Sequence, residues 1–305
     1  MNDQIFRSGF VSLIGQPNAG KSTLLNALVG AKVAIVADKP QTTRSAIQGV
    51  LTTDHAQVVF IDTPGIHKAD SPINRHLMKV LRSSLDERDL LLFVTDASLE
   101  FRAPDRHALD LVKKWETPAI LVLNKIDLLR DRTKLLKMIE SYRVAHDFSD
   151  YVPISAAKGE NVDVLREAII TRMPEGPAYF PREHISDQPE RFLAAELIRE
   201  KILAVTRQEV PHSVAVLVDN WDDTPTLLRV YATIYVERQG QKGIIIGAGG
   251  SNLKQVGTNA RQEMERIFGK KVFIDLHVKV EPGWKEKSSF LDTLDWRTMA
   301  GKDES

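Results

Sequence analysis

The sequence predicts two domains, a larger one built on a mostly parallel sheet and a smaller one that mixes helices and strands. The length of 305 residues is enough for about two hydrophobic cores. Short apolar runs alternate with longer amphipathic stretches from residue 8 to about 173, and prolines then break the rhythm over 174–190. We therefore expect an α/β domain over 1–173, a Pro-rich linker over 174–190 and an α+β domain with a C-terminal helix over 191–305.

The first domain is expected to contain six strands with helices on both faces, because its strands are apolar along their whole length. The expected strands are Gly9–Ile14, Ala46–Leu51, Gln57–Ile61, Leu90–Thr95, Ala119–Leu123 and Tyr151–Ile154. The expected helices are Lys21–Val29, Ile73–Asp86, Pro104–Lys114, Thr133–His146 and Val162–Thr171. Only residues 52–56 separate the second strand from the third, which predicts an antiparallel hairpin at one edge.

The second domain is expected to follow the order α-β-β-α-α-β, with only a short helix before a glycine-rich turn. Its expected elements are a helix over Arg191–Arg207, strands over Ser213–Val218 and Leu228–Val236, the turn Gly247–Gly250, a helix over Leu253–Phe268 and a strand over Val272–Val280. After these, Trp284, Phe290, Leu291, Leu294 and Trp296 predict a closing helix whose apolar side chains pack rather than stack on bases.

Composition excludes several classes of function. The 41 basic and 41 acidic residues cancel, so binding to nucleic acid would need a local basic patch. The absence of cysteine excludes disulfides, thiol catalysis and cysteine-ligated metals. No apolar run approaches the ~20 residues that a membrane span needs, and no leader opens the chain. We expect a cytoplasmic protein and leave peripheral contact with a membrane open.

The first motif is Gly-x-x-x-x-Gly-Lys-Ser, which occupies residues 15–22 directly after the first strand. In such a loop the backbone N–H groups cradle phosphates, the lysine reaches the β- and γ-phosphates, and the serine binds Mg²⁺. The following helix, starting at about Gly20, adds its positive end to the same place. We expect nucleotide contacts from Gly15, Gln16, Pro17, Asn18, Ala19, Gly20, Lys21, Ser22 and Thr23.

The second motif, Asn124-Lys125-Ile126-Asp127, follows the fifth strand and indicates guanine. An aspartate can accept hydrogen bonds from both the ring N–H and the exocyclic amino group of guanine, a donor pair that adenine lacks. Ser155-Ala156-Ala157-Lys158 follows the last strand, where backbone N–H groups can meet the guanine carbonyl oxygen. The expected base pocket consists of Asn124, Lys125, Asp127, Ser155, Ala156 and Lys158.

The third motif, Asp62-Thr63-Pro64-Gly65, ends the third strand and is followed by Ile66. Asp62 is expected to hold Mg²⁺ through a water, and the Gly65 N–H to bond the γ-phosphate. Thr42 and Thr43 offer hydroxyls for Mg²⁺, and the sequence leaves open which of them binds. Lys21, Thr42, Thr43 and Gly65 are the expected catalytic residues, and residues 31–44 and 63–72 are the candidate switches that GTP orders.

In the second domain, the turn Gly247-Ala248-Gly249-Gly250 between two helices is typical of KH domains, which use it to let a nucleic-acid backbone approach. Residues 240–287 contain nine basic and five acidic side chains, and this excess of positive charge suits phosphate contacts. The inner positions, Ala248 and Gly249, carry no charge where KH domains often place a lysine. The expected RNA-binding residues are Ile246, Gly247, Ala248, Gly249, Gly250 and Lys254.

The motifs of residues 1–173, in this order, resemble the Ras-like GTPase superfamily, and nearly the whole chain resembles the Era family of bacterial GTPases with a type II KH domain. Gln41-Thr42-Thr43-Arg44 and the linker from Gly176-Pro177 to Arg191-Phe192 share in this resemblance. It implies a P-loop GTPase that uses Mg²⁺, binds the 3′ end of small-subunit ribosomal RNA and assists maturation of the small ribosomal subunit. It also implies some association with the inner face of the cell membrane.

Two positions bear on the rate of hydrolysis. Many relatives carry a glutamine where this chain has Ile66, so we expect slow intrinsic hydrolysis. Asn18 matches the residue with which some GTPases hold K⁺, but it would serve equally to cap the backbone of its own loop.

Two other functions stay open at this stage. One is a GTPase switch whose second domain binds a protein or a membrane instead of RNA. The other is a metabolic phosphotransferase, against which Asn124 and Asp127 argue because they select guanine. For partners we expect the small ribosomal subunit and its RNA, no DNA, and a monomeric chain.

Overall fold

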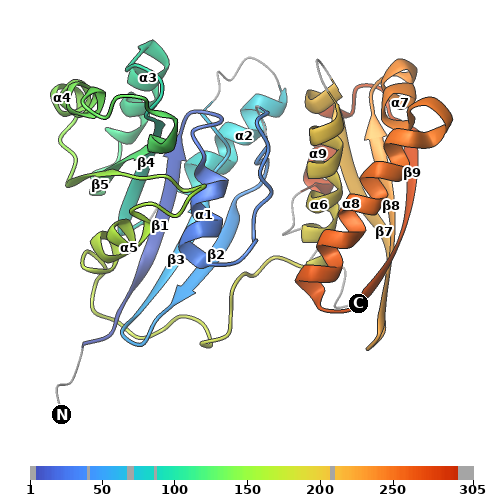
Figure 1. Ribbon diagram of the computed structural model, residues 1–305, viewed down its shortest axis with the longest axis horizontal. Helices are drawn as coiled ribbons and strands as arrows, with labels where there is room; N and C mark the ends of the chain where they lie inside the picture. The colour runs from blue at the N-terminus through green and yellow to red at the C-terminus, as the bar shows by residue number, and fades with distance from the viewer. Residues whose placement is uncertain (1–4, 40–41, 67–71, 86–87, 207–209, 295–305) are drawn as a thin grey trace. The chain divides into compact units, whose positions relative to one another are not determined.

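The computed structural model describes residues 5–39, 42–66, 72–85, 88–206 and 210–294 (Figure 1). Contacts between residues divide the chain into two compact units. Unit 1 comprises Met1–Ala34, Ala46–Ala69 and His76–Asp187, and unit 2 comprises Ile35–Ser45, Asp70–Arg75 and Gln188–Ser305. The segment 35–45, which contains the candidate magnesium ligands Thr42 and Thr43, therefore belongs to unit 2 by its contacts.

Unit 1 is built on the six-stranded sheet that the apolar runs predict. Its strands, in the order β2-β3-β1-β4-β5-β6, are parallel except for β2, which pairs with β3 in antiparallel fashion at one edge. Their bounds are β1 Arg7–Gly15, β2 Ile47–Thr52, β3 Ala56–Asp62, β4 Leu90–Asp96, β5 Ala119–Asn124 and β6 Asp150–Pro153. β3, β4 and β5 are buried along almost their whole length, as strands covered on both faces must be.

The helices of unit 1 are α1 Lys21–Val29, α2 Pro72–Ser83, α3 Ala103–Val112, α4 Lys134–Ala145 and α5 Val162–Ile170. Each lies within a few residues of its expected range. α1 buries Leu24, Leu25 and Leu28 and ends at Gly30, whose φ of 78° is the left-handed conformation that terminates a helix. Because β1 leads directly into α1, the phosphate-loop motif lies at the carboxyl end of the sheet.

The proline-rich segment differs from the expected linker, because residues 174–187 are bound to unit 1. The side chain of Gln57, buried in β3, accepts hydrogen bonds from the backbone N–H groups of Tyr179 and Phe180. The Ile185 carbonyl accepts from Val50 N–H in β2 at 2.8 Å. Residues 174–187 are therefore held against β2 and β3 by hydrogen bonds, and we call this segment the strap.

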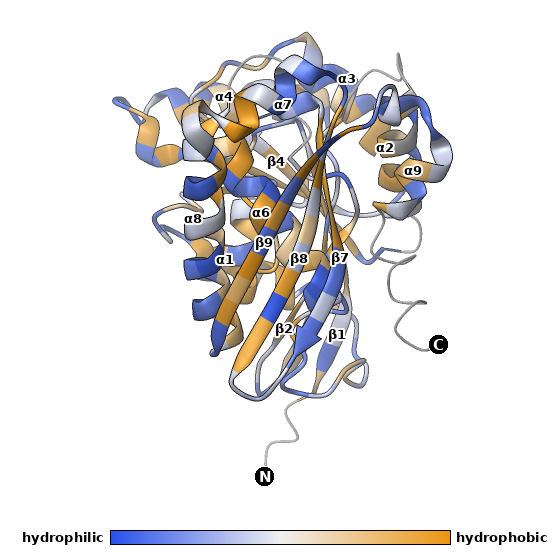
Figure 2. Cartoon of the chain, turned by 90° about the vertical axis from the view of Figure 1, so that its right-hand side faces the viewer, coloured by the Kyte–Doolittle hydropathy of each residue, from blue (hydrophilic) through white to orange (hydrophobic). Residues whose placement is uncertain are grey.

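Unit 2 contains a three-stranded sheet in the order β7-β8-β9, with β7 antiparallel and β9 parallel to β8. The strands are β7 Val214–Asp223, β8 Leu227–Val236 and β9 Lys271–Val280, and Figure 2 shows them side by side. β7 runs five residues beyond its expected end at Val218, because a bulge between Val218 and Asn220 lets pairing continue. The hydrophilic stretch at the end of β7 concealed this extension.

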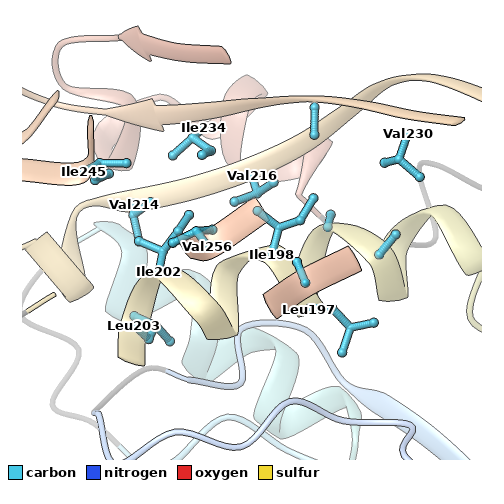
Figure 3. Close-up of a cluster of buried hydrophobic side chains, with 14 of the residues drawn as sticks. Leu197, Ile198, Ile202, Leu203, Val214, Val216, Val230, Ile234, Ile245 and Val256 are labelled. Atoms are coloured by element: carbon cyan, nitrogen blue, oxygen red, sulfur yellow. The ribbon is translucent and has the colours of Figure 1, made fainter. Parts of the chain in front are cut away.

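The helices of unit 2 are α6 Glu190–Val205, α7 Gln239–Ile246, α8 Ser251–Phe268 and α9 Ser288–Thr293. Together with the strands they give the expected order α-β-β-α-α-β before α9. The core joins α6 to the sheet: Ile198 and Ile202 of α6 lie beside Val216 and Val214 of β7 (Figure 3), and Leu197 belongs to the same cluster. Trp284 is fully buried and donates to the Ser213 carbonyl, which confirms its expected packing role, whereas Trp296 lies outside the described residues.

Candidate nucleotide and nucleic-acid sites

The phosphate loop takes the conformation that its glycines allow. Gly20 has a φ of 91°, and a Cβ there would lie 2.3 Å from the side-chain nitrogen of Asn124, so only glycine fits. The Lys21 Nζ atom lies 3.2 Å from the Gly15 carbonyl oxygen and 3.1 Å from that of Gln16. Burial lowers the pKa of Lys21, while the Asp62 carboxylate acts in the opposite direction. An ammonium group held by two carbonyls at the mouth of the loop is placed to exchange them for phosphate oxygens.

Asn124 connects the phosphate loop with the two loops expected to bind the base. Its side-chain nitrogen donates to the Ala19 carbonyl at 2.9 Å. Its side-chain oxygen accepts from the backbone N–H groups of Lys125 at 2.8 Å and Ala156 at 3.0 Å. Because Asn124 is almost fully buried at the end of β5, these three hydrogen bonds fix the loops relative to one another.

The base-recognition residues are brought together as the sequence predicts. The Ser155 hydroxyl donates to a carboxylate oxygen of Asp127 at 2.6 Å, although the two residues are 28 positions apart. The Lys158 N–H lies 3.2 Å from the same hydroxyl oxygen. Lys125 takes a left-handed φ of 66°, which turns the chain between Asn124 and Asp127. The Asp127 carboxylate is thus held in place in the segment that follows β5, and the residue is exposed.

Asp96 is a residue that the sequence argument missed. Its carboxylate forms an ion pair with Lys125 at 2.8 Å. Partial burial raises the pKa of Asp96, but hydrogen bonds from Lys125 and Ser98 outweigh this effect, and the pKa is lowered overall. Asp96 is the last residue of β4, so the rule that sites form at carboxyl ends of parallel strands would have found it.

The residues expected around Mg²⁺ fall into two groups. The Ser22 hydroxyl donates to the Asp62 carboxylate at 2.6 Å, so a hydroxyl and a carboxylate meet beside the phosphate loop. These are the oxygen ligands that Mg²⁺ prefers, directly or through water. Thr42 and Thr43 lie in the segment assigned to unit 2, where the Thr42 hydroxyl donates to the Lys39 carbonyl at 2.6 Å.

Gly65 lies against the phosphate loop. A Cβ on this residue would be 2.9 Å from backbone and side-chain atoms of Pro17. The Ile66 N–H lies 3.3 Å from the Gly15 carbonyl oxygen, and the Ile66 side chain is buried among apolar residues of unit 1. The Thr63 hydroxyl donates to the Leu13 carbonyl at 2.6 Å, which anchors the segment before Pro64 to β1. The remainder of the candidate switch, residues 67–71, lies outside the described residues.

The glycine turn of unit 2 connects α7 to α8. Gly247, Gly249 and Gly250 have φ angles of 74°, 59° and 80°, which L-residues with side chains rarely adopt. A Cβ on Gly247 would lie 2.8 Å from the Asn252 side chain, whose nitrogen donates to the Ile244 carbonyl. Ala248, Gly249 and Lys254 are exposed, and Ile246 is half-buried. The turn thus presents an uncharged backbone to solvent, with a lysine one turn along α8.

Comparison with known proteins finds a matching family for each of the two parts of the chain. A family described as "50S ribosome-binding GTPase" matches residues 10–125, and the KH domain family matches residues 209–285. A crystal structure of an Era point variant from Aquifex aeolicus, bound to GDP and AlF4⁻, is 38% identical with a TM-score of 0.92. That match covers 95% of this chain and 99% of the other. Era in complex with MgGDPNP and nucleotides 1506–1542 of 16S ribosomal RNA matches equally well.

Proposed function

This chain belongs to the Era family of GTPases, and from that premise we propose that it is a GTP-hydrolysing switch that binds the 3′ end of small-subunit ribosomal RNA and assists small-subunit maturation. The observation that carries the proposal is the likeness over 95% of the chain to an Era structure holding GDPNP and a 16S ribosomal RNA fragment. Residues 1–173 would be the GTP-binding domain, 174–190 the linker and 191–305 the RNA-binding domain.

The phosphates and Mg²⁺ would be held by the loop of residues 15–23 together with Asp62. Lys21 would leave the Gly15 and Gln16 carbonyls and bind the β- and γ-phosphates. Ser22 and Asp62, already 2.6 Å apart, fit a magnesium ion by their oxygen chemistry, and Thr42 or Thr43 would complete its ligands. Mg²⁺ supplies electrostatic stabilisation of the charge that moves onto the leaving oxygens.

Asp127 would select guanine, because a carboxylate accepts from both donors on that edge of the base. Ser155 holds one oxygen of Asp127, and the backbone N–H groups after β6 would face the guanine carbonyl. A measured preference for ATP over GTP would contradict this assignment and favour a phosphotransferase.

GTP hydrolysis by the protein alone would be slow. Many relatives carry a glutamine that orients the attacking water. In this chain the same position is Ile66, which is buried and has no polar side-chain atom. Asn18, in the phosphate loop with a φ of 63°, is our proposed K⁺ ligand. We expect K⁺ to accelerate turnover, and equal rates in K⁺ and Na⁺ would remove this part of the proposal.

RNA would bind at the glycine turn, where Ile246, the turn residues 247–250 and Lys254 line the approach of the backbone. The turn of three glycines and one alanine would allow close contact, and the basic excess over residues 240–287 would attract phosphates. A membrane or protein partner for this unit is the competing possibility, which the uncharged positions Ala248 and Gly249 keep open.

The segment 35–45 offers a way to couple nucleotide to RNA. In unit 2, Ile35 is buried in the hydrophobic core, and Val36 N–H donates to the Glu200 carboxylate at 2.8 Å. Arg199 donates to the Thr42 carbonyl. If Thr42 or Thr43 binds Mg²⁺ beside GTP, the segment must exchange these partners. The coupling would be no larger than the difference in GTP affinity between the two arrangements.

The decisive experiment is fluorescence anisotropy with a single-stranded RNA matching the 3′ end of small-subunit ribosomal RNA. It would be run at one salt concentration with GDP and with a non-hydrolysable GTP analogue, beside a scrambled RNA. We expect tighter, sequence-selective binding with the analogue. Binding that ignores the nucleotide would remove the coupling, and the absence of selective binding would favour a protein or membrane partner.

For location and assembly we propose a monomeric cytoplasmic protein that contacts the inner face of the membrane only peripherally. Among the described helices, none has the length and apolar character needed to cross a bilayer. Sedimentation with and without vesicles of anionic lipid would test the peripheral contact.

A further inference from the structure

Unit 2 contains a small cavity between two buried arginines. Its volume is about 20 Å³, and every residue that lines it belongs to unit 2. Arg44 comes from the segment 35–45, while Arg199 and Glu196 come from α6. Apart from these three residues and Ser45, the lining is apolar. We call it the Arg44–Arg199 cavity.

Arg199 is 2% exposed and its charge is compensated. Its Nε and Nη2 atoms donate to the two carboxylate oxygens of Glu196 at 2.7 and 2.6 Å. Nη2 also donates to the Thr42 carbonyl, whereas Nη1 is buried and has no hydrogen-bond partner among the described residues. One buried nitrogen of this guanidinium is therefore left without an acceptor among these residues.

Arg44 is 9% exposed, and no carboxylate pairs with it among the residues that the structure describes. Nη1 donates to the Val214 carbonyl at 2.7 Å, and the guanidinium lies 5.5 Å from the centre of the Trp284 ring. Nε and Nη2 are buried, and in the part of the chain that the structure describes they have no hydrogen-bond partner. Burial, together with the nearby Arg199 charge, lowers the pKa of Arg44 to about 9, so the side chain is still a cation at neutral pH.

The cavity lining thus carries two positive charges and one negative charge, and three guanidinium nitrogens find no acceptor among the described residues. Leaving a buried cation and its donors uncompensated is strongly unfavourable, so a ligand here should be an acceptor and an anion. The volume of about 20 Å³ suits a single particle of about the size of a water molecule. A monatomic anion fits this volume more closely than a phosphate or carboxylate group, which has several heavy atoms.

We propose that the Arg44–Arg199 cavity is a binding site for a monatomic anion of the halide class, such as chloride. The ion would accept from the Nε and Nη2 atoms of Arg44 and the Nη1 atom of Arg199, and it would neutralise the excess positive charge. It would also connect segment 35–45 to α6, because one arginine comes from each. A water molecule would fill the same space but would leave the charge uncompensated.

The direct test is to crystallise the protein from sodium bromide and collect data at the bromine absorption edge. We expect an anomalous peak in the cavity, in contact with both guanidinium groups. Density without an anomalous signal, or an empty cavity, would overturn the proposal. The measurement involves neither nucleotide nor RNA, so its failure would leave the proposed function untouched.

A second test uses thermal unfolding in solution. Gluconate is replaced stepwise by chloride at constant sodium and ionic strength. We expect a saturable rise of several degrees in Tm, since a ligand that binds only the folded state stabilises it by mass action. Arg44→Gln should abolish the saturable part. Arg229→Gln, which removes an arginine that is 41% exposed and paired with Asp222, should keep it.

A shift that is linear in chloride and equal in both variants would count against the site, because such behaviour is typical of a general salt effect. If Arg44→Gln does not fold, the bromide crystal of the unmodified chain still decides the question.

Discussion

The side-chain amide nitrogen of Asn124 donates a hydrogen bond to the Ala19 carbonyl at 2.9 Å, so the end of strand β5 directly supports the phosphate loop. The same side chain accepts from Lys125 and Ala156. The expected phosphate-binding and base-binding motifs, which are separate in the sequence, therefore share one buried residue. Substituting Asn124 should affect both ends of the nucleotide.

Asn124→Ala removes three buried hydrogen bonds. At about 1 kcal/mol each, we expect GDP affinity to fall by about 100-fold and the Tm to fall with it. Titration with a fluorescent GDP derivative measures the first effect and thermal unfolding the second. Gln48→Ala, which removes one exposed amide hydrogen bond in unit 1, is the matched control and should change neither. Unaltered GDP binding in Asn124→Ala would show that the shared support is unimportant.

Gly65→Ala places a methyl group 2.9 Å from Pro17 atoms, two of which are backbone. The segment must move away from the phosphate loop, so we expect GTP hydrolysis to fall by at least about tenfold, the size of about 1.4 kcal/mol of lost transition-state stabilisation. GDP binding should remain within a few-fold, because Gly65 is expected to contact only the γ-phosphate. Single-turnover hydrolysis separates the two quantities.

Gly240→Ala is the control for this substitution, since a Cβ at Gly240 meets nothing within 4 Å. Hydrolysis by Gly65→Ala at the rate of the control would remove Gly65 from the catalytic assignment.

Because the pKa of Lys21 is lowered, we expect GDP binding to be accompanied by uptake of a proton at this side chain. Burial lowers the pKa of Lys21 in the nucleotide-free protein, with Asp62 opposing the shift, and phosphate beside the ammonium would raise the pKa again. Between the two pKa values, binding should take up as much as about one proton, and affinity should fall as pH rises through the lower value. Calorimetry in buffers of different ionisation enthalpy measures the uptake.

Guanosine, which lacks phosphates, is the control ligand and should bind without this uptake. Equal proton uptake with GDP and guanosine would place the titrating group elsewhere.

Changing the charge at Ala248 should change the affinity of the glycine turn for RNA. It is exposed and uncharged, so Ala248→Lys should strengthen binding by adding one phosphate contact, and Ala248→Asp should weaken it. For Ala248→Lys the slope of log affinity against log salt should steepen by about 0.7, the value for one contact on a single strand. The same substitutions at the exposed Leu136 of unit 1 are controls. If both positions respond alike, the charge acts at long range and the turn does not contact phosphate.

The sequence predicts elements whose cause is local and misses contacts that depend on distant residues. Apolar runs, glycines and the Gly-Lys-Ser spacing act within a few positions, so the strands, the helices and the phosphate loop follow from them. The strap does not, because the groups that bind it lie on β2 and β3, more than a hundred positions earlier. Arg199 was missed for a similar reason: an arginine in a helix is typical of an exposed face, and only the folded unit buries it.

The strap has a consequence for self-association. β2 is the edge strand of its sheet, and an edge with unsatisfied N–H groups is a template for pairing with another chain. The Ile185 carbonyl takes the Val50 N–H, and the Ser186 hydroxyl donates to the Gln48 carbonyl, so two backbone groups of that edge are already bonded. A chain whose strap is cleaved or displaced should expose this edge and aggregate at concentrations where the intact chain stays dispersed.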